Sequence, residues 1–455
     1  MAVPDIHKWR YIFHFTDIHN LDSIIKNGLL CQNEKTMRGI KHKNIANMTI
    51  QTRRAKLEVP VKPRGMVHDY VPFYFSSINP MLLTLLNQKN VDQCYIVYLC
   101  VRIERLENDD AVFTDASANR DEAPNFYTDT EQLIQLDWTL IDSKKWRMPS
   151  DDDKHKKMAE AFIYQKVELS DIDCIVVWNE CVKQKVIDIF KENGIEAPDV
   201  VYNGNKKLSE YSFYYTKFFI PGQERNTLVT GPLELYNKYQ YLLKSIVEER
   251  KKKKLFTYQK IEDLLIVIDD KFTALPELKE LTDLQQDYIP HNDTVEEHTK
   301  KVIAEIKKQA YYYQAAEEKK AVLVLSAYLH DIGKGPKDKW GDDVMKYAYL
   351  DHPADAIPML YRILTEEIAT LSEEDIRQIC MLVVYHDIIG DCMLRGREKE
   401  QIAVIIINEE DFEMLFAISI ADAKAIKPEW AENIMLGKDK LCHEVFEVKD
   451  KFLWQ

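Results

Sequence analysis

Residues 321–336 read AVLVLSAYLHDIGKGP, a strongly apolar run that ends in a histidine and an aspartate side by side. The apolar run predicts a buried helix. An imidazole and a carboxylate at the end of such a helix are costly to bury unless each has a partner. A metal ion bound by both side chains would be such a partner. The stretch therefore predicts a helical domain that carries a metal site.

Further metal-type ligands stand on other apolar stretches of the same half. From about residue 232 onward the apolar residues follow a helical period, with breaks at prolines and glycines, so this half is predicted to be all-α. Ligands from separated helices can converge inside such a bundle, and imidazoles with carboxylates suit Mn, Fe, Co, Ni, Zn or Mg. One or two divalent cations are therefore expected at six residues: His298, His330, Asp331, His352, His386 and Asp422.

The order of these residues resembles that of the HD-domain phosphohydrolases over about 275–430. The segments PELKELTDLQQDYIPHNDTVEEHTKKVI, YLHDIGK, YLDHPADAI and ISIADAKA are similar to the HD module attached to bacterial tRNA nucleotidyltransferases. The resemblance implies metal-dependent hydrolysis of a nucleotide or another phosphoester. It also implies a catalytic role for Lys334 as a phosphate clamp, with an exposed lysine at a helix end as the alternative. Asp387 is a candidate additional ligand beside His386.

The first half alternates short β-branched or aromatic runs with helical patches, which predicts an α+β domain. The doublet His68–Asp69 in this half has no other ligand-type residues around it, and we do not expect it to bind metal. The fold class expected is multidomain. An α+β domain over 1–205 is followed by a connector with amphipathic helices over 206–274 and by an all-α HD domain over 275–455.

Charge is distributed unevenly along the chain. The sequence has a formal net charge of -14, from 61 Lys and Arg against 75 Asp and Glu, which argues against a surface coated uniformly for nucleic acid. Residues 35–64 nevertheless contain nine Lys or Arg and one acid, a local charge of +8. Such a segment favours an anionic ligand, with a solvated basic loop as the alternative.

Cysteine usage and hydropathy bear on localisation. The eight cysteines include no CxxC pair, and the start MAVPDIHKWR lacks the features of a signal peptide. The longest apolar runs are shorter than the roughly 20 residues that cross a bilayer. A cytoplasmic protein with reduced thiols and no membrane span is expected.

Three stretches of the first half, in this order, resemble the DarT family of DNA ADP-ribosyltransferase toxins over about 10–205. They are YIFHFTDIHNLDSIIKNGLL, IANMTIQTRRAKLEVPVKPRGMVHDYVPFYFSSINPML and KKMAEAFIYQKVELSDIDCIVV. The resemblance implies an ADP-ribosyltransferase fold, NAD⁺ as the substrate, and thymidine in single-stranded DNA as the favoured acceptor, with RNA or protein as alternatives. It also implies a toxin or phage-defence role, with a separately encoded macrodomain antitoxin as a partner.

The same resemblance implies roles for individual residues. Glu160 is the expected catalytic carboxylate, and Arg54 is the expected arginine beside the pyrophosphate and the reaction centre, with Arg53 as the competing assignment. The remaining expected NAD⁺ contacts are His14, Thr16, Asn20, Tyr70 and Phe73. Physical chemistry supports these residue types, because cleavage of the nicotinamide bond develops positive charge on the ribose, which a fixed carboxylate stabilises, and an arginine fork suits a diphosphate. The alternative hypothesis makes this half a nucleotide or nucleic-acid binding module and leaves all chemistry to the HD domain.

Overall fold

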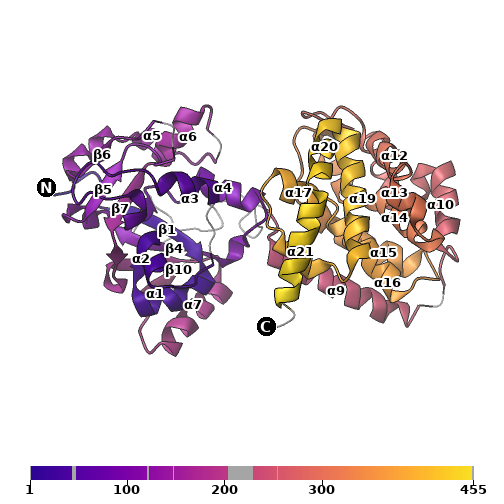
Figure 1. Cartoon of the computed structure of the whole chain (residues 1–455), viewed down its shortest axis with the longest axis horizontal. Coiled ribbons are helices and arrows are strands. Elements are labelled where there is room, and N and C mark those ends of the chain that lie inside the picture. Colours follow the sequence, from indigo (N-terminus) through magenta and orange to yellow (C-terminus); the bar gives the residue numbers. More distant parts are fainter. Residues whose placement is uncertain are drawn as a thin grey trace. The chain divides into compact units, whose positions relative to one another are not determined.

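The computed structural model describes residues 2–43, 48–119, 122–146, 148–202, 229–253 and 255–452. The chain divides into two compact units, Met1–Gly231 (unit 1) and Pro232–Gln455 (unit 2) (Figure 1). The first part of the expected connector, 206–228, lies outside the described residues. No described helix has both the length and the apolar character needed to span a membrane.

Unit 1 is built on an eight-stranded sheet with helices packed against it, so the α+β prediction is confirmed. The strand order is β10-β9-β4-β1-β3-β7-β5-β6, and all neighbours are antiparallel except β10 and β9. In this order the strands are Asp199–Val201, Ile172–Val176, Ile96–Arg102, Tyr11–Asp17, Tyr70–Tyr74, Glu160–Tyr164, Ala111–Thr114 and Phe126–Tyr127. The helices are α1 (Leu21–Asn27), α2 (Gln32–Met37), α3 (Met48–Arg54), α4 (Pro80–Asn87), α5 (Trp138–Ile141), α6 (Asp151–Lys157) and α7 (Glu180–Glu192).

The register of the sheet brings distant residues into one row. Phe13 of β1 pairs with Tyr74 of β3, and Tyr74 pairs in turn with Glu160 at the start of β7. Burial fixes this register, because every residue of β7 from Glu160 to Ile163 is buried and a shift by one residue would disrupt packing on both faces. The expected catalytic residue Glu160 therefore lies two strands away from β1, which carries His14, with β3 between them.

Unit 2 is helical, as predicted, with one short parallel ladder between β11 (Gln285–Gln286) and β12 (Val344–Met345). Its helices are α9 (Pro232–Arg250), α10 (Ile261–Asp270), α11 (Pro276–Lys279), α12 (Val295–Ile306), α13 (Ala310–Gln314), α14 (Glu317–Leu329), α15 (His352–Glu366), α16 (Glu373–Val384), α17 (Ile388–Leu394), α18 (Glu400–Ile405), α19 (Glu409–Ile426), α20 (Pro428–Leu436) and α21 (Lys438–Phe452). Helix α14 contains the AVLVLSA run and is buried along most of its length, which is why the run is apolar on all sides.

The helices expected in the connector belong to unit 2. Leu235, Tyr239 and Ile246 of α9 lie in the same hydrophobic core as α14. Arg250 at the end of α9 donates to the carbonyls of Leu364 and Ile368, which closes the end of α15. The compact C-terminal unit therefore begins at Pro232 rather than at the expected residue 275, because α9 and α10 bury their apolar faces in its core.

Candidate active site and candidate metal centre

The carboxylate of Glu160 is fully buried and held by two donors. Its Oε2 accepts a hydrogen bond of 2.6 Å from the backbone N–H of Ala118, and Arg54 Nη1 lies 2.7 Å from Oε1 and 3.0 Å from Oε2. Thr114 on the neighbouring strand accepts from the Glu160 backbone N–H at 3.2 Å. These contacts fix the side chain, because a buried carboxylate is tolerated only when it is paired and hydrogen-bonded. Ala118 lies between β5 and β6, and its role could not be inferred from sequence.

Arg54 lies between Glu160 and an open cavity. It ends α3, is 7% exposed and lines the cavity, whereas Glu160 does not. Burial works to lower the pKa of Arg54, but the charge of Glu160 outweighs it and the pKa is raised. The expectation that Glu160 faces the ligand directly therefore needs a correction, since in this structure the Arg54 guanidinium covers its carboxylate.

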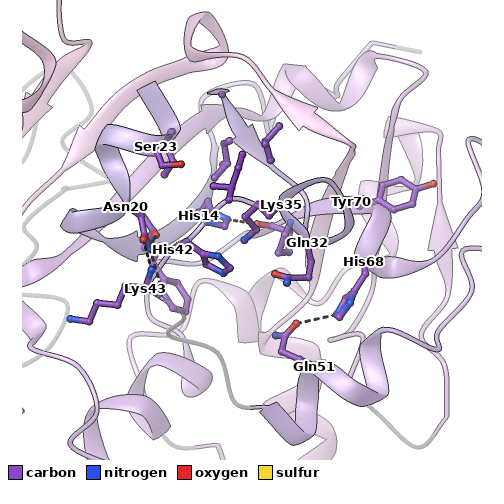
Figure 2. A pocket seen from close by; sticks show the side chains of 18 of the residues that line it. His14, Asn20, Ser23, Gln32, Lys35, His42, Lys43, Gln51, His68 and Tyr70 are labelled. Atoms are coloured by element: carbon purple, nitrogen blue, oxygen red, sulfur yellow. Dashed lines mark hydrogen bonds between the residues drawn. The ribbon is translucent and has the colours of Figure 1, made fainter. Parts of the chain in front are cut away.

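The cavity is lined by β1, β3 and the helices α1 to α3 (Figure 2). It includes four of the other expected NAD⁺ contacts, which are His14, Thr16, Asn20 and Tyr70. Phe73 does not line it. Its side chain is fully buried and packs edge-on against His14, with the ring centroids 5.7 Å apart. The expectation that Phe73 contacts NAD⁺ is therefore wrong. Phe73 is a core residue that packs against the His14 imidazole.

The tautomer of His14 follows from its hydrogen bond. Nδ1 lies 2.8 Å from the carbonyl oxygen of Pro72, which can only accept, so Nδ1 carries the proton. Burial lowers the pKa of His14 to about 4, and the ring is therefore neutral near pH 7. The remaining nitrogen, Nε2, is an acceptor suited to a hydroxyl or amide donor of a ligand.

Asn20 fixes the wall of the cavity with its amide. Its Nδ2 donates to Thr16 Oγ1 and to the carbonyl of Lys43, both at 3.0 Å, and its Oδ1 accepts from the Lys43 backbone N–H at 2.7 Å. Figure 2 shows Asn20 next to Lys43 at one side of the cavity. Both amide hydrogens are thereby used, so the residue acts on a ligand mainly by holding Lys43 in place.

Sequence reasoning missed several polar residues of the cavity: Gln32, Lys35, His42, Gln51 and His68. Their signal was the local excess of cations in 35–64. Carboxylates of the protein itself neutralise part of that positive charge, because Arg54 pairs with Glu160 and Lys43 Nζ lies 2.7 Å from Asp17 Oδ2. His68 contacts Gln51 Oε1 at 3.0 Å, while Asp69 accepts from Asn33 and from the Met66 backbone. Among the described residues, this doublet belongs to no group of metal-type ligands.

In unit 2 the six expected metal ligands converge. They form two groups, and within each group the ligand atoms all lie within 4.8 Å of one another. One group is His298, His330 and Asp422, and the other is Asp331, His352 and His386. Asp331 faces both groups, because its Oδ2 is 3.2 Å from His330 Nε2 and its Oδ1 is 3.5 Å from His352 Nε2. The neighbouring Asp387 approaches the second group, with Oδ1 3.5 Å from His386 Nε2.

The chemistry of this cluster fits divalent cations. The six ligands are four imidazoles and two carboxylates, of which five are buried and Asp422 has 15% of its side chain exposed. Nε2 of His330 is buried without a hydrogen-bond partner, which is costly unless something else binds it. Burial works to lower the pKa of His330, but the carboxylates of Asp331 and Asp422 outweigh it and raise the pKa to about 9. The two carboxylates therefore give the cluster a negative charge that favours either a proton on His330 or a bound cation.

Lys334 is buried next to this cluster. Its Nζ donates to Asp331 Oδ2 at 2.6 Å and to Gln286 Oε1 at 3.0 Å. The alternative of an exposed helix-end lysine is therefore wrong. A cleft over the cluster is lined by Lys334 and, among others, Tyr288, His291 and Trp430.

Comparison with known proteins gives consistent matches for unit 1. A family model described as "ssDNA thymidine ADP-ribosyltransferase, DarT" matches residues 13–208. A DNA ADP-ribosyl transferase of Thermus sp. (strain 2.9) is 34% identical over 187 residues, 40% of this chain and 87% of the relative. A second, from Escherichia coli O127:H6, is 31% identical over 194 residues, 41% of this chain and 86% of the relative. The solved structure of Thermus sp. 2.9 DarT in complex with ADP-ribosylated ssDNA is 31% identical, covers 44% of this chain and 96% of that one, and has a TM-score of 0.40.

Proposed function

This chain belongs to the DarT family of DNA ADP-ribosyltransferases through unit 1, and we propose that unit 1 transfers ADP-ribose from NAD⁺ to thymidine in single-stranded DNA. The proposal includes a toxin or phage-defence role in the cytoplasm. It also includes a separately encoded macrodomain antitoxin that removes the modification.

The observation that carries the transferase proposal is the buried pair of Glu160 and Arg54 at the wall of a cavity that also presents His14. Cleavage of the nicotinamide bond leaves positive charge on the ribose carbon, and a fixed carboxylate in a dry site stabilises that charge strongly. The Glu160 carboxylate can also accept the proton of the incoming base. Because Arg54 covers it, a small movement of the guanidinium has to precede contact between Glu160 and the sugar.

A transfer assay tests this proposal. The full chain is incubated with labelled NAD⁺ and each of the four deoxynucleotide homopolymers, with RNA and protein as further acceptors, and the products are analysed by mass spectrometry. We expect an added ADP-ribose on oligo-dT and none after Glu160→Gln. Label on RNA or protein alone would show that the acceptor is wrong, and no label on any polymer would support the binding-module hypothesis.

We propose a second function for unit 2, a metal-dependent phosphohydrolase of the HD type, and the convergence of the six ligands supports it. A bound divalent cation would lower the pKa of its water and polarise a phosphoryl oxygen. His298, His330 and Asp422 would hold one cation and His352 with His386 a second, with Asp331 between them. Lys334 would contact the phosphate, since its ammonium lies at the same cleft. The proposed substrates are a nucleotide signal, an RNA end or a phosphoester near the modified base.

Metal analysis tests this second function independently of activity. We expect about one or two transition-metal ions per chain in protein purified without chelator. The double substitution His330→Ala and Asp331→Ala should abolish binding and phosphohydrolysis while ADP-ribosyl transfer persists. Metal-free protein with full hydrolase activity would contradict the assignment.

A further inference from the structure

Three cationic side chains line the cavity of unit 1, namely Lys35, Lys43 and Arg54. Two of them already have a carboxylate partner. Lys43 Nζ is 2.7 Å from Asp17 Oδ2, and Arg54 Nη1 is 2.7 Å from Glu160 Oε1. The carboxylate in an ion pair neutralises most of the electrostatic field of its cation, so these two residues attract an anion only weakly unless their ion pairs separate.

Lys35 differs from the other two. It lies on α2 with its side chain directed into the cavity near His14 (Figure 2). None of the cavity-lining residues in the described part of the chain is an Asp or a Glu, and the ammonium has no ion pair or hydrogen bond there. Lys35 is half-buried, and this burial lowers its pKa.

The charge of Lys35 reaches the centre of the cavity. Burial is the main cause that lowers the pKa of three surrounding imidazoles, those of His14, His42 and His68, and the charge of Lys35 acts on each of them in the same direction. An ammonium that has lost water and has no counter-ion gains most from a ligand that brings negative charge. The surrounding groups are neutral donors and acceptors, such as the amide of Gln32, which suit the remaining polar atoms of such a ligand.

We propose that Lys35 binds the diphosphate of the dinucleotide in unit 1, a role that sequence resemblance gave to Arg54. This inference rests on the proposed function, since that function supplies a diphosphate ligand. The assignment leaves Arg54 at the reaction centre, where it holds the Glu160 carboxylate in position. It also makes Lys35 a determinant of specificity for ligands with a diphosphate over uncharged nucleosides.

The test measures binding of ADP-ribose, inorganic pyrophosphate and adenosine to the full chain by calorimetry at two salt concentrations. Lys35→Met removes the charge and keeps the length of the side chain, and Lys35→Arg keeps the charge. Lys26→Met is the matched control, because Lys26 is an exposed α1 residue outside the cavity whose ammonium pairs with Asp22 at 2.7 Å. A thermal melt of each variant checks folding.

We expect Lys35→Met to weaken ADP-ribose binding about 10- to 100-fold, the usual value of a charge-assisted hydrogen bond. Pyrophosphate competition should be lost and the salt dependence reduced, while adenosine binding, Lys35→Arg and Lys26→Met stay within about threefold of the unsubstituted protein. Unchanged ADP-ribose affinity in a Lys35→Met protein that still transfers ADP-ribose would overturn the inference and leave the proposed function intact. Equal loss of adenosine and ADP-ribose would also overturn it, as damage to the cavity. An unsubstituted protein that binds neither ADP-ribose nor NAD⁺ would contradict the proposed function itself.

Discussion

Replacing Glu160 by Gln should separate its structural contribution from its catalytic one. The substitution keeps an oxygen that can accept from the Ala118 N–H, but it leaves the Arg54 guanidinium without a counter-charge in a site where Arg54 is 7% exposed. Removing one partner of a buried ion pair costs about 3–5 kcal/mol. We expect the lower end, about 3 kcal/mol, because the amide oxygen still accepts a hydrogen bond from Arg54. For a unit of this size, that corresponds to about 6–12 °C in Tm.

Calorimetry of the full chain measures this loss in the transition that ADP-ribose shifts to higher temperature, which identifies unit 1. Adding Arg54→Met to Glu160→Gln removes both charges, so the double variant should recover about 2 kcal/mol relative to the sum of the single effects. Transfer to oligo-dT should fall at least about 1000-fold in Glu160→Gln and stay absent in the double variant. Additive destabilisation would refute the ion-pair argument, and more than a tenth of normal transfer in Glu160→Gln would refute the catalytic one.

Three further predictions address the other residues. His14 has a pKa lowered to about 4, so ADP-ribose affinity should be constant from about pH 8 to 5 and fall as the pH drops through about 4, which titration calorimetry measures. Unit 1 should also lose stability as the pH falls from 6.5 toward 4, because only the unfolded chain takes up the proton in that range, and pH-dependent melts measure this loss. Asn20→Ala removes the three hydrogen bonds of its amide and should raise KM for NAD⁺ about tenfold with kcat within about threefold, as measured by initial rates, whereas an equal fall in kcat would indicate a direct catalytic role. His352→Ala should leave about half of the bound metal, whereas Asp331→Ala should leave almost none, because Asp331 faces both ligand groups. Elemental analysis measures the bound metal, and equal losses in the two variants would indicate a single cation.

The cluster of candidate metal ligands in unit 2 shows what the sequence could predict. Its ligands stand at the ends or on the buried faces of apolar helices, so the chemistry of each residue and its position in the bundle were both visible in the one-dimensional pattern. Phe73 shows a signal that was available and not used. Tyr70, Pro72 and Tyr74 line the cavity, and the alternation of side chains along a strand places Phe73 on the opposite face.

Other features depend on contacts between distant segments and left no local signal. Arg54 and Glu160 are 106 residues apart, and the hydrogen bond from Ala118 comes from a third segment. Whether a cation in the basic 35–64 stretch is paired or available also depends on tertiary neighbours. Lys43 and Lys35 look alike in sequence, yet Lys43 has Asp17 beside it, whereas the described residues that line the cavity around Lys35 include no acid.

The two candidate sites share one electrostatic arrangement. In unit 1 Arg54 holds Glu160 at 2.7 Å, and in unit 2 Lys334 holds Asp331 at 2.6 Å. A buried carboxylate needs such a cation when no ligand is bound, so each pair keeps its carboxylate charged and fixed in position. A site whose charges are already ordered pays a lower free-energy cost when a ligand binds. The same pairing explains why neither carboxylate is exposed, although each is the centre of the chemistry proposed for its unit.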